Sequence, residues 1–442
     1  MTFGDFFGSC LPLDDIVLLQ QGVIAGKRRQ GDDTVMGEFE NAMRTGQLDM
    51  IKSGFIRAVI RKVAMILAMS LFLSAQPSDI LAQTPQEDKT PILLGQSCAL
   101  TGPSKNLGLE LRAGLLAAFS KVNDEGGVDG RDILLISRDD GYEPDRAVRN
   151  TKAFIQDEAI FMLIGEVGTP TSNAVLPLIE EHKIPFFAPF TGAEVLRQPF
   201  RKHVINVRAS YYQEMERLAA YLIDKKKIRK IACFYQDDSY GLDGLKGIEL
   251  ALARRGLNLV AKGSYERNTV AVLRGLTDVL QADPEAVVLA GTYSACAEFI
   301  KLSKARTSKK LLFCNISFVG TESLKNALGR YGSDVIVSQV VPYPQDTELP
   351  LIHEYTDAMG KYQHDAPISF TSLEGYMAGK LFAQIVAKVP GELTREKFIA
   401  TMEQVGTFDL GGVTLQFGPV DHQGMDAVYL TEINPDLKKV KE

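Results

Sequence analysis

Hydroxyl-bearing residues follow several apolar, β-rich runs in the first half of this chain. Thr101, Thr169 and Thr191 each come shortly after such a run, beside a glycine. A threonine hydroxyl at the start of a helix can cap it, or it can donate to a ligand carboxylate held near the N–H groups of the helix end. Both roles are open here. The predicted binding residues on this side are Thr101, Leu107, Val167, Gly168, Thr169, Phe190, Thr191 and Gly192.

A second group of residues follows the first, third and fourth strands expected in the second half of the chain. This group adds aromatic rings to hydroxyls. The chain has 22 Phe and 14 Tyr but no Trp, so any aromatic wall must come from Phe and Tyr. In parallel sheets, ligands bind beyond the carboxyl ends of the strands. The predicted residues are Tyr240, Thr292, Tyr293, Ser317 and Phe318.

The residue patterns of common enzymes are missing from the sequence. It contains no GxSxG, no HExxH and no GxGxxG after a strand. Its five histidines are scattered without ligand spacing. The segment GYMAGKL at Gly375 is one residue too short for a phosphate loop, and Asp139 with Asp140 suits a polar loop at a strand end. We therefore expect no enzyme activity, no cofactor and no metal site.

Charge and cysteine content narrow the class of protein further. The formal charge of -6 arises from 49 basic and 55 acidic residues that form no long block, which argues against a nucleic-acid partner. No two of the five cysteines have the spacing of a CxxC pair. Cys233 and Cys314 lie inside apolar runs, as is typical of buried, unreactive thiols. No disulfide is predicted.

Ten short apolar runs alternate with segments of helical period. The runs span residues 92–97, 133–137, 160–165, 184–189, 203–208, 230–235, 257–263, 286–291, 311–316 and 334–341. This alternation is typical of parallel sheets covered by helices on both faces, and ten strands exceed a usual single open sheet. We therefore predict an α/β protein with two Rossmann-like, doubly wound lobes.

Helical period returns near the C-terminal end, over residues 349–363, 369–388 and 394–404, before a hairpin-like pair of strands at 413–418 and 427–433. A long helical stretch after the second series of strands implies that the chain goes back to the first lobe. Several linkers would then form a multi-strand hinge. The predicted boundaries are 90–207 and 342–408 for the first lobe, and 208–341 and 409–435 for the second.

A secretory signal is predicted well inside the sequence. A basic stretch that ends at Lys62 precedes an uncharged apolar run, residues 63–75, and a short polar stretch with small residues follows. The apolar run is shorter than the ~20 residues that span a bilayer as a helix. We expect a signal peptide over residues 50–82, export to the periplasm, and cleavage after about Ala75 or Ala82.

Residues 1–49 precede this signal and show mixed polarity with no sustained period. Because a secretory signal normally begins a chain, one interpretation is that translation starts at Met50 and that the first 49 residues are a start-site misassignment. A disordered cytoplasmic extension is the alternative. The sequence leaves both open.

Five segments between residues 90 and 435 occur in a characteristic order and spacing. They are a first strand ending in LTGP, a helix ending before Gly126-Gly127, a second strand ending in Asp139-Asp140, the segment IGEVGTPTSNAVLPLIEEHKIPFFAPFTGAE, and FYQDDSYGLDGLKG. Together they resemble the leucine/isoleucine/valine-binding family, the type I periplasmic solute-binding proteins of ABC importers. The resemblance implies a monomer that closes on a small-molecule ligand and delivers it to a membrane permease. A periplasmic sensor that feeds a signalling receptor is the alternative function.

One position departs from the family pattern. Where the branched-chain amino-acid binders carry a glutamate that pairs with the ligand's ammonium, the alignment places Ser317. Without that acid, a buried ammonium would be unpaired, which is costly. Glu166, Asp237 or Asp238 could supply the charge or could have structural roles. The resemblance therefore implies a ligand that is an amino acid, an amide, or an organic or aromatic carboxylate, with Thr169 among its contacts.

Overall fold

The computed structural model describes residues 90–157, 160–434 and 436–440. The predicted signal peptide, the 49 residues before it and Cys10 lie outside this described part of the chain. The described residues all belong to one compact unit.

Five parallel strands form the first sheet, in the order β2-β1-β3-β4-β5. They are β1 (Ile92–Cys98), β2 (Ile133–Asp139), β3 (Met162–Ile164), β4 (Phe186–Phe187) and β5 (Val204–Ile205). Leu94 of β1 pairs with Leu135 on one side and with Met162 on the other. The strand order therefore reverses between β1 and β3, and this reversal is where doubly wound sheets open a ligand crevice.

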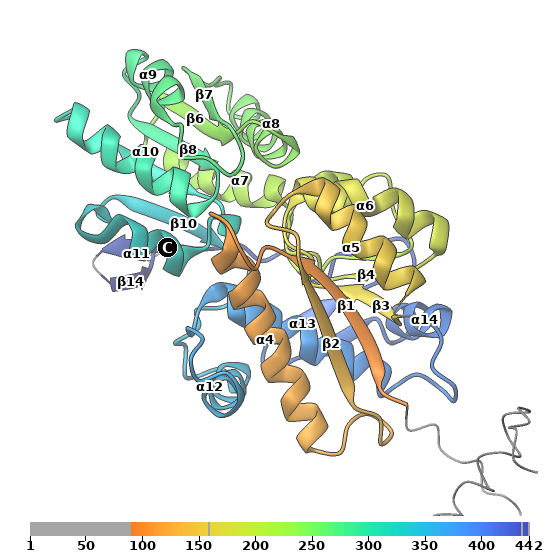
Figure 1. Ribbon diagram of the computed structural model, residues 1–442. Helices are drawn as coiled ribbons and strands as arrows, with labels where there is room; N and C mark the ends of the chain where they lie inside the picture. Colours follow the sequence, from red (N-terminus) through yellow and green to blue (C-terminus); the bar gives the residue numbers. More distant parts are fainter. Residues whose placement is uncertain (1–89, 158–159, 435, 441–442) are drawn as a thin grey trace, which may run out of the picture. The chain divides into compact units, whose positions relative to one another are not determined.

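Helices from both ends of the described chain cover this first sheet. They are α4 (Lys105–Asp124), α5 (Pro144–Gln156), α6 (Thr169–His182), α12 (Pro350–Tyr362), α13 (Phe370–Val386) and α14 (Arg395–Val405). Helices α4 and α13 lie side by side in Figure 1. A Cβ atom on Gly114 of α4 would collide with the Ser372 carbonyl of α13, so glycine permits this close packing. Phe382 packs edge-on against Phe187, with ring centroids 6.2 Å apart.

The second sheet has seven strands in the order β14-β13-β10-β9-β8-β6-β7. They are β6 (Ile231–Gln236), β7 (Lys262–Tyr265), β8 (Ala286–Ala290), β9 (Leu312–Asn315), β10 (Val335–Gln339), β13 (Tyr429–Asn434) and β14 (Asp436–Lys439). Its helices are α7 (Tyr211–Ala219), α8 (Ser239–Ala253), α9 (Leu273–Gln281), α10 (Tyr293–Arg306) and α11 (Thr321–Leu328). The prediction of two doubly wound sheets is confirmed, because the parallel part β7-β6-β8-β9-β10 repeats the order of the first sheet.

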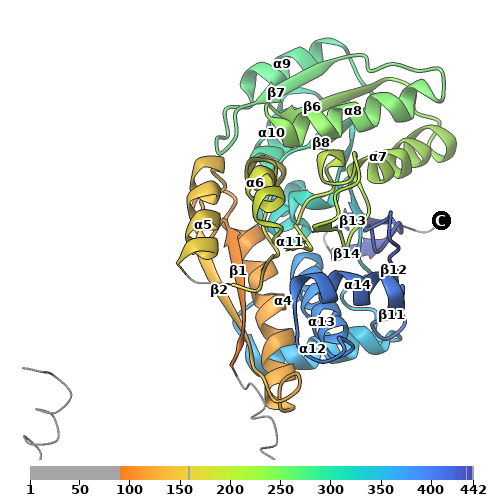
Figure 2. The same ribbon diagram turned by 90° about the vertical axis from the view of Figure 1, so that its right-hand side faces the viewer.

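The predicted pairing of residues 413–418 with 427–433 is wrong. Strand β12 (Thr414–Gln416) pairs with β11 (Thr407–Asp409), whereas β13 pairs with β10 and β14. Figure 2 shows β11 and β12 beside α14.

The contacts of the β11–β12 hairpin attach it to helices of the first lobe. Lys380 Nζ donates to the Leu410 carbonyl at 3.0 Å, and the Leu351 N–H donates to the Gly411 carbonyl at 3.0 Å. The predicted lobe boundary after residue 408 stays a prediction, and these contacts favour a boundary beyond the hairpin.

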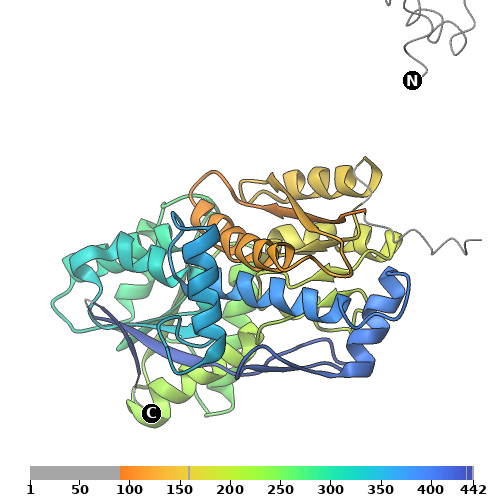
Figure 3. The same cartoon turned by 90° about the horizontal axis from the view of Figure 1, so that it is seen from below.

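Two of the segments that join the lobes run alongside each other. The Asn206 N–H donates to the His422 carbonyl, and the Gly424 N–H donates to the Asn206 carbonyl, both at 2.8 Å. Figure 3 shows the last part of the chain (dark blue) running from the first lobe to the C-terminal strands. The segment that holds Asn206 and the segment that holds His422 and Gly424, the first and third crossing segments, therefore form a paired ribbon.

The four described cysteines are free and buried, as predicted for unreactive thiols. Burial raises the pKa of the Cys233, Cys296 and Cys314 thiols, which keeps them protonated at neutral pH. Within the described residues, none of the helices has the length and apolar character needed to cross a membrane.

Candidate functional site

Phe318 lies at the centre of a ring cluster drawn from both lobes. Its ring centroid is 4.6 Å from that of Tyr240, 5.4 Å from that of Phe190 and 6.0 Å from that of Tyr142. Tyr211 completes the cluster, 5.4 Å from Tyr240. All five rings are buried. Phe190 and Tyr142 follow strands of the first sheet, and Tyr240 and Phe318 follow strands of the second, so the carboxyl edges of the two sheets meet here.

Two threonine hydroxyls form one polar end of this ring cluster. Thr169 Oγ1 lies 2.7 Å from Thr191 Oγ1, which also lies 3.2 Å from the hydroxyl of Tyr211. Thr169 begins α6, yet the N-cap residue is Gly168 and no side chain caps the helix. Thr191 has a local role as well, because its hydroxyl accepts a hydrogen bond from the Ala193 N–H at 3.2 Å. Thr169 is therefore not a helix cap, and its hydroxyl faces the cluster's polar end.

Two glycines allow the side chains around the cluster to approach closely. Gly168 has φ +104°, and a Cβ atom there would collide with the Tyr142 ring. Gly320 has φ +76°, and a Cβ atom would lie 2.6 Å from Leu107 Cδ2. Leu107 of the first lobe therefore packs directly on Gly320 of the second.

A second polar group beside the cluster, its charged end, is built around Arg208, whose side chain is 1% exposed. Its Nη2 atom donates to Glu214 Oε1 at 3.3 Å and to Ser317 Oγ. Its Nη1 atom is 3.5 Å from Glu374 Oε1, and its Cζ atom is 4.8 Å from the centroid of the Phe190 ring. Nε and Nη1 have no hydrogen-bond partner. The guanidinium thus lies against the ring cluster with unused donors.

Glu214 of α7 is fully buried and is the main anion at this charged end. Besides Arg208, Oε1 accepts from Ser317 Oγ at 2.9 Å. Oε2 accepts from the Ser317 N–H at 2.8 Å and from Ser338 Oγ at 2.6 Å. These four bonds fill the acceptor capacity of an ionised carboxylate. Ser317 therefore has an acid beside it, supplied by a helix rather than by its own loop.

Glu374 of α13 is the second acid that faces Arg208. Burial raises the pKa of Glu374 to about 7, against the lowering effect of Arg208. Burial also acts to lower the pKa of Arg208, but Glu374 and Glu214 outweigh it, so the guanidinium stays charged. The charged end thus holds one fixed cation and one acid that titrates near neutral pH.

The structure brings six of the predicted residues together. They are Thr169, Phe190, Thr191, Tyr240, Ser317 and Phe318. Val167 pairs with Phe190 through an isolated β-bridge, and Gly192 lies against the Tyr211 ring. These two residues therefore support the cluster through the backbone.

Three predicted residues lie at the margin or outside the cluster. The Thr292 N–H donates to the Tyr265 hydroxyl at 2.9 Å, and the Tyr293 hydroxyl accepts from the Asn106 N–H at 3.4 Å. Thr101 is exposed, and its hydroxyl donates to Asp139 Oδ2 at 2.7 Å. Thr101 thus orders the loop after β1.

The acids considered as replacements for the family's glutamate have other surroundings. Glu166 is buried, and desolvation raises its pKa well above the ordinary value, which favours its protonated form. Asp238 caps α8 and contacts Arg267 at 3.3 Å. Asp237 is exposed. The acid beside Ser317 is Glu214 instead.

Sequence reasoning predicted Ser317 but missed the three charged side chains around it, Arg208, Glu214 and Glu374. Arg208 and Glu214 flank the start of α7, at the boundary predicted between the lobes. The available signal was Ser210 with Gln213, a capping box that fixes the helix start and turns Glu214 inward. Glu374 lies inside a helix, where no strand end draws attention to it.

Polar contacts between the lobes surround the ring cluster. Gln236 Nε2 donates to the Tyr142 hydroxyl at 3.2 Å. Arg267 of the second lobe pairs with Glu143 of the first at 2.9 Å. The two lobes are therefore in contact around the cluster, and its side chains are shielded from solvent.

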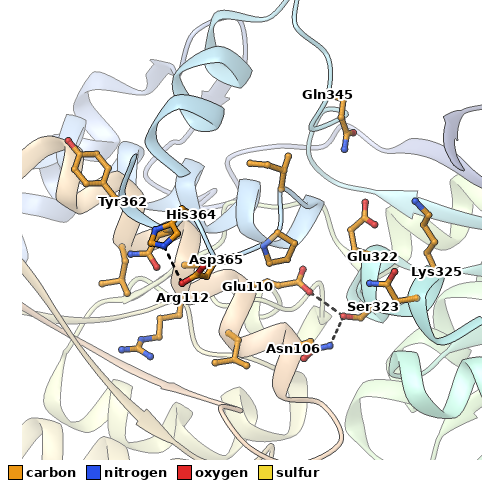
Figure 4. Close-up of a pocket in the computed structure, with 18 residues that line it drawn as sticks. Asn106, Glu110, Arg112, Glu322, Ser323, Lys325, Gln345, Tyr362, His364 and Asp365 are labelled. Atoms are coloured by element: carbon orange, nitrogen blue, oxygen red, sulfur yellow. Dashed lines mark hydrogen bonds and ion pairs between the residues drawn. The ribbon is translucent and has the colours of Figure 1, made fainter. Parts of the chain in front are cut away.

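A separate cavity of about 780 Å³ lies between α4, α11 and the loop after α12 (Figure 4). Glu110 lies on its wall, accepting from Ser369 Oγ at 2.6 Å and Ser323 Oγ at 3.2 Å, and burial raises its pKa to about 7. Exposed His364 and Asp365 form its rim. None of the predicted site residues lines this cavity. Because the buried acid is already satisfied internally, the ring cluster is the better candidate site.

Metal binding finds no support in the described ranges, where no three His, Cys, Asp or Glu side chains are grouped so that they could hold an ion.

Known proteins share both the sequence pattern and the fold. A family model described as periplasmic binding protein matches residues 91–439. The Leu/Ile/Val-binding protein homolog 7 of Brucella abortus is 26% identical over 314 residues, which is 68% of this chain and 78% of that protein.

Solved structures extend the comparison. A possible leucine/isoleucine/valine-binding protein from Rhodopirellula baltica is 37% identical, with a TM-score of 0.77 over 81% of this chain and 98% of that one. A fatty acid ABC transporter substrate-binding protein from Thermomonospora curvata shares the fold at 22% identity, with a TM-score of 0.71 over 78% of this chain and 89% of that one. The chain belongs to the periplasmic binding protein family and has the two-lobed type I fold of its leucine/isoleucine/valine-binding members.

Proposed function

We propose that this protein captures a small organic solute between its two lobes in the periplasm and delivers it to the permease of an ABC importer. The observation that carries the proposal is the buried ring cluster, which takes side chains from the strand ends of both lobes and has a neutral and a charged polar group beside it. Ligands of hinged proteins bind between lobes that close on them. Relatives named for leucine, isoleucine and valine support a solute of that size.

Within this proposal, Thr169 and Thr191 bind the ligand's polar group, and Phe190, Tyr240 and Phe318 cover its apolar body. Opening would bend the segments that join the lobes and expose the cluster. Closure then desolvates the solute, and the closed form is what the permease recognises.

A thermal-shift screen tests capture directly. Exported protein is heated with amino acids, amides, and aliphatic and aromatic carboxylates, and a ligand at 100 times its Kd should add about 2.7 kcal/mol of stability. Tyr240→Ala should weaken the hit at least tenfold while preserving the circular dichroism spectrum, since it removes a ring that contacts Phe318. A screen with no stabilising solute would contradict capture.

Export and transport need their own measurements. Mass spectrometry of the periplasmic fraction should show a mature chain that begins shortly after Ala75 or Ala82, and retention of the upstream residues would contradict export. Uptake of the labelled hit should be lost when the gene is deleted. A signalling response without a loss of uptake would support the sensor alternative instead.

A further inference from the structure

The acids around the ring cluster have little capacity left for a ligand cation. Glu214 accepts four hydrogen bonds from Arg208, Ser317 and Ser338. Glu374 faces the same guanidinium at 3.5 Å. An ammonium group brought to either acid would lie next to a fixed positive charge, and like charges in a desolvated site repel strongly.

Arg208, in contrast, has N–H groups that make no hydrogen bond. Its Nε and Nη1 atoms are buried and lack hydrogen-bond partners, and unmet buried donors are rare in folded proteins. Its guanidinium is held in place by Phe190, Ser317 and Glu214. Two of these partners connect Arg208 to the cluster. Phe190 is one of its rings, 5.4 Å from Phe318, and Ser317 precedes Phe318 in the chain.

We propose that Arg208 is the specificity-determining residue of this site and that it selects organic acids without an ammonium group, offering its free N–H donors to a carbonyl or carboxylate oxygen of the ligand. This inference rests on the proposed capture of a solute between the lobes. The side chain occupies the place on Glu214 that a ligand ammonium would need, so the protein supplies its own cation.

The protonation of Glu374 couples this preference to pH. Glu374 faces Arg208 and Glu214, with Arg197 nearby, and burial raises its pKa to about 7. Below pH 7 the neutral acid leaves Arg208 free to attract an anion. Above pH 7 the ionised acid competes for the guanidinium, so acid binding should weaken by up to tenfold per pH unit.

Matched ligands that differ at one position give the sharpest test. 4-Methyl-2-oxopentanoate and leucine share a carboxylate and a branched body, but one carries a carbonyl oxygen where the other carries an ammonium. Phenylpyruvate and phenylalanine form a second such pair. Calorimetry should show that at least one oxo acid binds and that it binds at least tenfold more tightly than its amino-acid partner.

Arg208→Gln should then reverse the preference. It removes the internal cation and frees one acceptor position on Glu214, so the amino acid should gain at least tenfold relative to the oxo acid. Arg254→Gln is the matched control, since Arg254 pairs with Glu216 on the surface and its side chain is 60% exposed. Glu374→Gln should bind the oxo acid without the loss above pH 7.

The outcomes separate this inference from the proposed function. Equal or tighter binding of the amino acids by the unmodified protein overturns the inference and leaves solute capture intact. Failure of all the matched acids to bind also overturns it, and the wider thermal-shift screen then decides whether capture stands. If Arg208→Gln does not fold, the preference of the unmodified protein still tests the ligand class. Arg208→Lys, which keeps the charge but loses the planar fork, should weaken oxo-acid binding and still exclude the amino acid.

Discussion

The two polar ends of the ring cluster are built in opposite ways. At one end, Thr169 and Thr191 offer neutral hydroxyls on loops that follow β3 and β4. At the other end, Arg208, Glu214 and Glu374 form a buried charged group held by the first crossing segment, α7 and α13. A hydroxyl costs less to bury than a charged group and can rotate toward a ligand, whereas buried charges need partners of opposite charge. The hydroxyl end should therefore govern affinity, and the charged end should govern stability and selectivity.

Glu214→Ala should give the largest effect on stability. It leaves Arg208 without its main anion and removes the acceptor for Ser317 and Ser338, which should cost about 3–5 kcal/mol of unfolding free energy. Chemical denaturation measures the loss. Glu216→Ala on the same helix is the control, because its exposed ion pairs should contribute about 1 kcal/mol or less. Equal losses in the two variants would show that the charged end is not a structural group.

The pH dependence of stability should come next in size. Glu374 binds its proton more tightly in the folded protein, where its pKa is about 7 against an ordinary value of 4.5. Folded protein therefore holds more protons than unfolded protein between these values, so stability falls as pH rises through this window and levels off above it. In Glu374→Gln, the free energy of unfolding should fall by about 3 kcal/mol less across this pH window. The change in Tm from pH 4.5 to 8 checks this, and identical slopes in both proteins would refute it.

Thr169→Val should show the complementary behaviour at the hydroxyl end. Loss of a hydroxyl that contacts the ligand should weaken binding about five- to tenfold, or about 1–1.5 kcal/mol, with a small effect on Tm. Thr171→Val in the same helix is the control, because the Thr171 hydroxyl donates to the Val167 carbonyl at 2.6 Å and serves the helix. Calorimetry that finds the control weakened as much as Thr169→Val would remove Thr169 from the site.

Thr101→Val should have the smallest effect on binding. Thr101 follows a strand end as Thr169 does, but its hydroxyl serves Asp139. Hydrogen bonds from Thr101 and the Leu100 and Gly141 N–H groups, with Arg146, hold the pKa of Asp139 at about 2 despite partial burial. The variant should lose up to about 1 kcal/mol of stability and retain wild-type affinity. A larger Kd for this variant would show that Thr101 contributes to ligand binding.

The sequence located the hydroxyl end and Ser317, but not the charged side chains around Ser317, for a physical reason. Strand ends are visible as apolar runs that stop, so the loops that hold Thr169, Phe190 and Phe318 could be located by counting strands. Arg208 and Glu374 are placed by long-range packing, one in a crossing segment and one inside a helix. No local pattern distinguishes a buried charge there from a solvated one.

The same distinction explains the outcome for the fold. Periodicity predicted the two doubly wound sheets, since each strand and helix carries its own pattern. The wrong pairing of 413–418 with 427–433 arose because short strands pair according to tertiary contacts. Here Leu410 and Gly411 anchor the hairpin on the first lobe before the chain crosses.

The paired crossing segments have a mechanical consequence. Asn206 joins the first crossing segment to the third through backbone hydrogen bonds to His422 and Gly424, so these two segments run as a pair. Sliding of one segment past the other would break these hydrogen bonds, whereas bending of both segments together would keep them. Opening and closing would then favour bending over sliding. Threonines on one lobe and Ser317 on the other would return to the same alignment in every cycle.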